Sequence, residues 1–262
     1  MKLHIVPART GMAWVKLGLR VFWRQPMALT ALFFLTMVCL SLVAEIPLAG
    51  PVITQALLPL ATLAMMVAAA EAEQGHFPTP ALLLRVLRAS RQRLRAMLLL
   101  GALYAVGLLG IVALVDLLDS GQFSRVSLGE ALTPQDVLEN PAMWLAMLLY
   151  LVLSLLFWHA PGLVHWHGVP PVKALFFSIV ACLHNFRAFL VYGLGWIGVF
   201  LLGTLGGSLA VSLLVSAGLS KSVAGGIMVG VAMTMVAMFL TSVVFTFRDC
   251  FEPPHDRAQG AR

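Results

Sequence analysis

Six long runs of uncharged, mostly apolar residues divide this sequence, and they constrain its fold more than any other feature. The runs are between 17 and 33 residues long. A helix needs about 20 apolar residues to cross the hydrocarbon core of a bilayer, and in lipid its backbone polar groups must pair within the segment. The runs therefore predict six membrane-spanning helices, at about 27–46, 51–70, 96–118, 142–163, 188–216 and 222–247.

The composition supports the same class of protein. Hydrophobic residues make up 60% of the chain and charged residues only 11%, with a mean hydropathy of +0.95. A soluble domain carries about 25% charged residues, so a soluble enzyme and a nucleic-acid-binding module are both excluded. We expect an all-α polytopic membrane helix bundle of three hairpins. Residues 1–26 form an N-terminal interfacial segment, 27–247 the membrane domain, and 248–262 a tail.

The distribution of basic residues predicts the orientation of these spans. With the N-terminus in the cytoplasm, 15 of the 17 Lys and Arg residues fall on the cytoplasmic side, and only Arg125 and Lys221 fall outside. The long external loop, 116–140, is acidic instead. Cytoplasmic loops of membrane proteins carry an excess of Lys and Arg. We therefore expect a multi-pass protein of the bacterial inner membrane with both termini in the cytoplasm.

An amphipathic segment precedes each odd-numbered span, at Thr10–Gln25, Pro80–Arg95 and Val172–Arg187. In the first two, basic residues recur at helical spacing on one stripe, as in helices that lie in the headgroup plane: Lys16, Arg20, Arg24, Arg85, Arg88, Arg91 and Arg95. The third segment is far more apolar and too short to span, so it is interfacial, re-entrant or buried under the bundle. These basic residues predict that the segments bind anionic phospholipid in the lipid bilayer and do not bind nucleic acid.

Histidines and acids near the predicted cytoplasmic face suggest a metal-site hypothesis. The candidate ligands are His159, His165, His167, Glu71 and Glu73. His165 and His167 are two residues apart, about 200° on a regular helix, so they converge only if the helix has ended near Gly162 or Gly168. The alternative is an interfacial belt of Trp and His rings at the headgroup level.

Two further groups of residues carry hypotheses within the spans. Glu45 is the acidic residue near the outer end of the first span, and Gln55 is its candidate neighbour; ionisable groups in membranes are functional hypotheses by default. Glycines spaced four apart let helix backbones approach closely, and the last hairpin contains two such pairs: Gly203 with Gly207, and Gly226 with Gly230. Packing within the hairpin is the favoured interpretation, with a homodimer contact as the alternative.

Two stretches of sequence resemble those of a known family. They are Val6-Pro7-Ala8-Arg9-Thr10-Gly11 with Trp14, and Phe157-Trp158-His159-Ala160-Pro161 followed by the His165-Trp166-His167 motif. They resemble an uncharacterised family of Gram-negative bacterial inner-membrane proteins over nearly the whole chain. More distantly, the three-hairpin plan is similar to the membrane domain beside some glycerophosphodiester phosphodiesterases. Their catalytic barrel has no counterpart here, so the resemblance implies no such activity.

The motifs favour a non-enzymatic membrane protein. The sequence contains no Walker loop, nucleophile elbow or zincin motif, and we expect no cofactor. The favoured function is an envelope protein that binds anionic lipid or a protein partner, with a homo-oligomer as an alternative state. A small transporter or channel, motivated by Glu45 and Gln55, is the alternative function, followed by a membrane enzyme that uses the histidine group.

Overall fold

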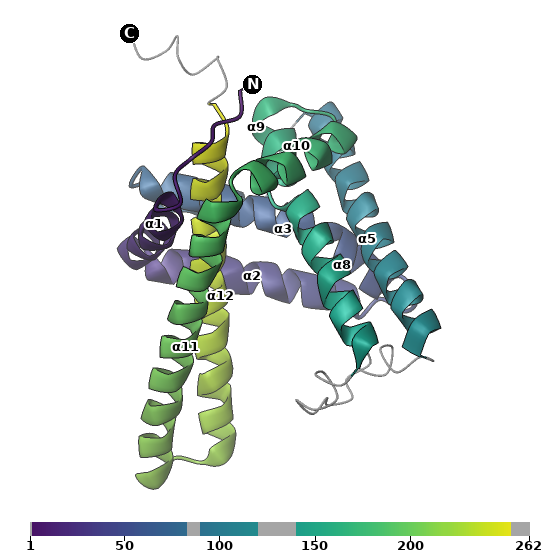
Figure 1. Cartoon of the computed structure of the whole chain (residues 1–262). Coiled ribbons are helices and arrows are strands. Elements are labelled where there is room, and N and C mark those ends of the chain that lie inside the picture. The colour runs from purple at the N-terminus through teal and green to yellow at the C-terminus, as the bar shows by residue number, and fades with distance from the viewer. Residues whose placement is uncertain (1, 83–89, 120–139, 253–262) are drawn as a thin grey trace. The chain divides into compact units, whose positions relative to one another are not determined.

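The computed structural model describes residues 2–82, 90–119 and 140–252, and these segments are predominantly helical. Figure 1 labels the helices as follows: α1 Thr10–Arg24, α2 Pro26–Ala44, α3 Gly50–Glu73, α5 Arg91–Asp119, α8 Pro141–Phe157, α9 Ala160–His167, α10 Pro171–His184, α11 Phe186–Ser216 and α12 Lys221–Cys250. Within the described residues the only β pairing is an isolated bridge between Leu3 and Phe251.

Six helical segments of the described chain are long and apolar enough to cross a membrane. They are α2, α3, α5, the pair α8 and α9 counted together, α11 and α12. Each coincides with one of the predicted spans. The predicted all-α polytopic bundle with six spans is therefore confirmed.

The spans are connected in consecutive pairs, two of which pack together. Residues 45–49 form the turn between α2 and α3, and the Thr54 hydroxyl of α3 donates a hydrogen bond to the Leu40 carbonyl of α2 at 3.3 Å. Helices α5 and α8 pack against each other, and so do α11 and α12. Gly218, with φ +104°, lies in the turn between α11 and α12, a backbone conformation that suits glycine.

The chain divides into two compact units. The first comprises Met1–Val38, Thr62–Arg88 and Ala181–Arg262, and it contains α1, α11, α12 and the adjoining parts of α2 and α3. The second comprises Cys39–Ala61 and Ala89–Val180, and it contains α5, α8 and α9. In the second unit the Tyr104 and Phe157 rings stack edge to face, 5.0 Å apart, and Gly101 of α5 lies against the backbone of Ala56 in α3.

The fourth span is not the continuous helix predicted over 142–163. It is broken at Trp158 and His159, between α8 and α9. Pro161 explains the break, because its ring has no N–H and clashes with the carbonyl four residues earlier. The Ser178 hydroxyl of α10 fills the gap: it accepts from the His159 N–H at 2.9 Å and donates to the Leu155 carbonyl at 2.8 Å. In an unbroken helix those two backbone groups would bond directly.

The amphipathic helix predicted over Pro80–Arg95 is also interrupted. Ser90 lies outside any helix, and α5 begins at Arg91. The Ser90 hydroxyl accepts a hydrogen bond from the Arg93 N–H at 3.4 Å. Serine competes well for the free N–H groups at a helix start, so a new helix begins here and its first turn continues into the third span.

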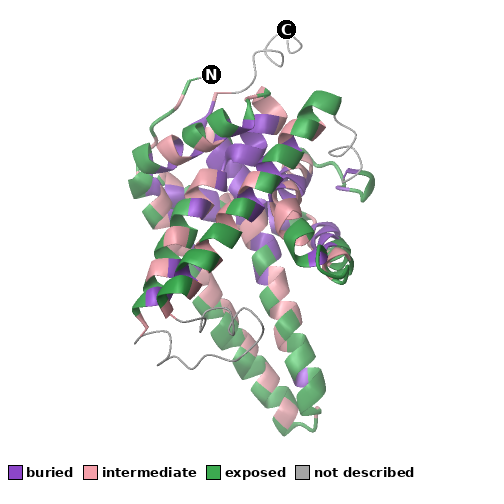
Figure 2. Cartoon of the chain, turned by 90° about the vertical axis from the view of Figure 1, so that its right-hand side faces the viewer, coloured by how far each residue is buried: buried purple, intermediate pink, exposed green. Residues whose placement is uncertain are grey.

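The α11–α12 hairpin is buried unevenly along its length. Figure 2 shows buried residues where the hairpin joins the rest of the first unit, and mostly exposed or intermediate residues toward its turn, where Ala224 is the exception. The most apolar window of α11 contains no buried residue. In a membrane protein, apolar side chains exposed in this way suit contact with lipid.

Candidate membrane-surface site

Helix α1 presents a basic face at one end of the α11–α12 hairpin. Lys16, Arg20 and Arg24 are all exposed, and their spacing of four residues places them on one stripe of the helix. The opposite face is buried, including Trp14 and Phe22. The amphipathic pattern of the first segment is therefore present in the structure, with the apolar face turned toward protein.

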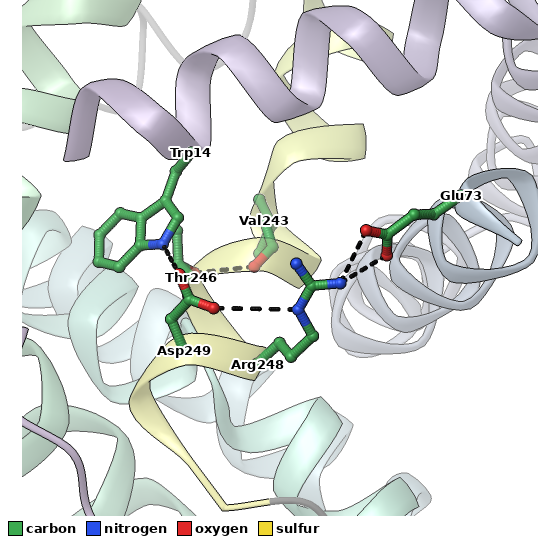
Figure 3. Close-up of polar contacts among 6 residues, drawn as sticks. All are labelled: Trp14, Glu73, Val243, Thr246, Arg248 and Asp249. Carbon is green, nitrogen blue, oxygen red and sulfur yellow. Dashed lines mark hydrogen bonds and ion pairs between the residues drawn. The ribbon is translucent and has the colours of Figure 1, made fainter. Parts of the chain in front are cut away.

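Trp14 is the centre of this buried face. It is 0% exposed, and its ring lies 5.4 Å from the Phe189 ring and 5.9 Å from the Tyr192 ring of α11. Its indole Nε1–H donates to Asp249 Oδ2 of α12 at 2.8 Å, as Figure 3 shows. A buried indole needs such a partner. One side chain thus joins α1 to both helices of the last hairpin.

Two glycines let α1 approach that hairpin closely. A Cβ at Gly11 would collide with the backbone oxygen of Ala188 in α11, and one at Gly18 would collide with the Ser242 side chain of α12. Beneath Gly18, the Ser242 and Tyr192 hydroxyls are 2.6 Å apart and hydrogen-bonded. Neither glycine belongs to the pairs predicted from the sequence. Their spacing of seven residues on an amphipathic helix is the signal that would have found them.

Asn185, between α10 and α11, binds the N-terminal segment to the end of α12. Its Oδ1 accepts from the Val6 N–H at 2.8 Å, and its Nδ2 donates to the His4 carbonyl at 3.0 Å and to the Ala181 carbonyl at 3.1 Å. The His4 N–H in turn donates to the Cys250 carbonyl at 2.9 Å. Residues near both termini therefore lie together at one end of the first unit.

Arg248 was counted among the predicted cytoplasmic bases, but the structure pairs it with an acid. Its guanidinium donates to both carboxylate oxygens of Glu73 in α3, at 2.8 and 2.6 Å, and stacks over the Phe245 ring at 5.1 Å. Its Nε lies 3.9 Å from Asp249 Oδ1. The basic face of this end is therefore formed by α1 rather than by α12.

The structure does not gather the metal-site candidates. Within the described chain there is no group of three or more His, Cys, Asp or Glu residues placed to hold a metal ion. Glu73 is paired with Arg248, and Glu71 with His76 Nδ1 at 3.1 Å. The metal hypothesis therefore gains no support from the described side chains.

The three histidines occupy two kinds of position around the break in the fourth span. His159 lies at the break itself and is fully buried. His165 and His167 lie in the last turns of α9, which ends at Gly168 in the left-handed conformation with φ +64°. Because the helix continues through both residues, their side chains leave it about 200° apart.

Of the four remaining basic residues predicted to bind headgroups, two lie in the described part of the chain and two do not. Arg91 and Arg95 are exposed in the first turns of α5. Arg85 and Arg88 lie outside the described residues. A contribution of these four to headgroup binding remains a prediction.

Glu45 lies at the end of the first span, and Gln55 lies within the second. Glu45 follows the last residue of α2 and is exposed in the turn to α3, whereas Gln55 is half-buried within α3. No hydrogen bond between the two side chains occurs in the described structure. Because a turn at the end of two spans gives a carboxylate access to water, Glu45 needs no buried partner.

The two predicted glycine pairs differ in their surroundings. A Cβ at Gly203 would collide with the flexible Met235 side chain of α12, and one at Gly207 would make ordinary contact with Val231 and Met228. Gly226 and Gly230 have no neighbouring atom within 4 Å of an added Cβ. Only the pair on α11 therefore faces its hairpin partner.

Comparison with known proteins shows the family. The chain is 35% identical over 259 residues to a protein of Burkholderia thailandensis named a "probable inner membrane protein", and the match covers 96% of this chain and 94% of that protein. No family model matches the chain, and no solved structure matches it. The match shows no link to glycerophosphodiester phosphodiesterases. With its six apolar helices, the chain belongs to the family of multi-pass inner membrane proteins that this Burkholderia protein represents.

Proposed function

We propose that this is a non-enzymatic inner membrane protein that uses the exposed face of α1 to hold anionic phospholipid headgroups. The observation that carries the proposal is the presentation of Lys16, Arg20 and Arg24 on one exposed stripe of a helix whose other face is locked into protein. Trp23, beside Arg24, is 66% exposed, and Trp side chains favour the level of the headgroups.

The position of α1 in the chain supports the same function. The helix ends at Arg24 and the first span begins at Pro26, so its last turn lies next to the point where the chain enters the membrane. Each Lys or Arg near an anionic leaflet contributes about 1 kcal/mol. Three residues therefore contribute about 3 kcal/mol, which is about a hundred-fold in affinity.

We place this face on the cytoplasmic side, with both termini. The pairing of residues 2–6 with the end of α12 supports a common side for the termini, which an even number of spans requires. The excess of basic residues in the loops on that side selects the cytoplasm. A phosphatase fused after residue 130 should then be active outside, and an inactive fusion would reverse the orientation.

Lipid that co-purifies with the protein tests the headgroup function directly. We expect the variant Lys16→Gln, Arg20→Gln, Arg24→Gln to lose phosphatidylglycerol relative to phosphatidylethanolamine when mass spectrometry quantifies the retained lipid. The matched control, Lys16→Arg, Arg20→Lys, Arg24→Lys, keeps the charge and should keep the lipid. An unchanged lipid ratio in the neutral variant would reject the proposal.

The fifth span gives the transporter alternative no support. Helix α11 continues from Phe186 to Ser216 through all its glycines, so the glycine-rich fifth span is not a broken helix of the kind that forms transporter sites. A protein partner or a second copy at the α1 face is an outcome of the same experiment. If another protein were retained in place of phosphatidylglycerol, a protein would be identified as the ligand of the α1 face.

A further inference from the structure

Helix α10 carries an apolar stripe on its exposed side. Val172, Phe176 and Leu183 are 67%, 61% and 57% exposed, and Ile179 is half-buried between them. These residues follow one another at spacings of four, three and four. They therefore lie within about 60° of one helix face at 3.6 residues per turn.

The opposite face of α10 carries only small or polar side chains. Ala174, Ser178 and Ala181 are fully buried, and Cys182 is nearly so. The Ser178 hydroxyl bonds the backbone at the break between α8 and α9, so this face is held against protein. The arrangement is the reverse of α1, where the large side chains are inside and the exposed stripe is charged.

The place of α10 in the chain supports a position at the membrane surface. The helix connects the fourth span to the fifth. Helix α11 begins at Phe186, two residues after α10 ends, and its side chains Phe186, Leu190 and Leu194 are exposed. A short helix that joins two spans lies where those spans leave the membrane.

Charge complementarity identifies what covers the stripe. The exposed residue Lys173 lies on one flank of the stripe, Arg187 follows α10 in the chain and is exposed, and no acidic residue occurs between Gly168 and Phe189. An apolar stripe beside basic residues suits a helix that lies in the interface plane, with its apolar side about 5–10 Å into the boundary between headgroups and acyl chains.

We infer that α10 is inserted in one leaflet of the bilayer, with Val172, Phe176, Ile179 and Leu183 among the acyl chains and Lys173 at the headgroups. The occupant of this face is phospholipid, and the contact is independent of the headgroup binding proposed for α1. The two helices engage the membrane differently, since α1 presents charge and α10 presents apolar side chains.

A fluorescent probe on a single cysteine tests the depth of the stripe. Cys182 and Cys250 are buried, so a Cys39→Ala background leaves no exposed native thiol. An environment-sensitive fluorophore attached to Phe176→Cys is compared with one on Lys173→Cys, the matched control on the flank. The labelled proteins are reconstituted in phosphatidylethanolamine and phosphatidylglycerol vesicles, with or without phosphatidylcholine that carries a doxyl group on its acyl chain.

We expect the doxyl lipid to quench the probe at position 176, and aqueous iodide to quench it several-fold less than the probe at 173. Equal iodide quenching at both positions would overturn the inference. Protection of position 176 from both quenchers would also overturn it, because it would place protein on this face. Leu183→Cys provides a second position on the stripe, with the same expected result, if the variant at 176 does not fold.

Discussion

Replacing Ser178 with Ala should destabilise the protein far more than the loss of one surface hydroxyl. This single oxygen accepts from the His159 N–H at 2.9 Å and donates to the Leu155 carbonyl at 2.8 Å. The substitution leaves both backbone groups facing a methyl group. They cannot simply bond to each other, because Pro161 keeps the helix broken at this point.

The magnitude follows from the burial of the groups involved. Ser178 and His159 are both fully buried, so water has no access to replace the hydroxyl. A buried donor or acceptor left without a partner costs about 1–3 kcal/mol. Losing the hydroxyl therefore predicts a cost of about 1–3 kcal/mol in the free energy of unfolding from the buried His159 N–H, and a smaller further cost from the half-buried Leu155 carbonyl.

Denaturant-induced unfolding in detergent, followed by circular dichroism in the helical region, measures this loss. Ser208→Ala is the control, since Ser208 is exposed on α11, and substitutions at such positions usually stay within about 0.5 kcal/mol. If Ser178→Ala behaved like the control, the hydroxyl would not be completing the backbone of the fourth span. The account of the break would then be wrong.

Three further tests of the packing of the first unit use the same unfolding measurement. Asn185→Ala should cost about 3 kcal/mol, because three hydrogen bonds of about 1 kcal/mol each are lost; a cost near zero would show that the N-terminal segment is not held here. Gly11→Leu should cost at least about 1–3 kcal/mol by overpacking, while Gly226→Leu should be tolerated because its surroundings are open. Similar costs at the two glycines would contradict the close approach of α1. A double-mutant cycle on Glu73 and Arg248 should give at most about 1 kcal/mol, since both side chains are partly exposed, and a larger coupling would mean that the pair is shielded from water.

Hydropathy predicts where helices cross the membrane, but it does not predict how they pack. The uncharged runs identify the six spans because charge is costly in lipid and its absence can be read directly from the sequence. Inside a span, residues that face lipid and residues that face protein are equally apolar. The emphasis on Gly226 therefore had no basis in the packing, while Gly11 and Gly18, on a helix outside the spans, were overlooked.

Polar contacts between segments that are distant in the chain also cannot be predicted from the sequence. Asn185 and Ser178 belong to no recognisable motif, and their partners are backbone groups, which every residue has. Pro161 disfavours a continuous helix in the fourth span. The sequence offered no means of knowing which side chain, 17 residues later, would repair it.

The burial of α1 bears on how its basic face would bind lipid. Burying a large apolar side chain contributes about 1.5–3 kcal/mol, so Trp14, Val21 and Phe22 together contribute about 5–9 kcal/mol to holding α1 against the rest of the protein. The three exposed bases contribute about 3 kcal/mol toward an anionic leaflet. Docking onto protein is thus the larger effect, and α1 is ordered before it meets lipid. Headgroup binding then requires no folding of the helix, which separates this surface from amphipathic helices that fold only on the membrane.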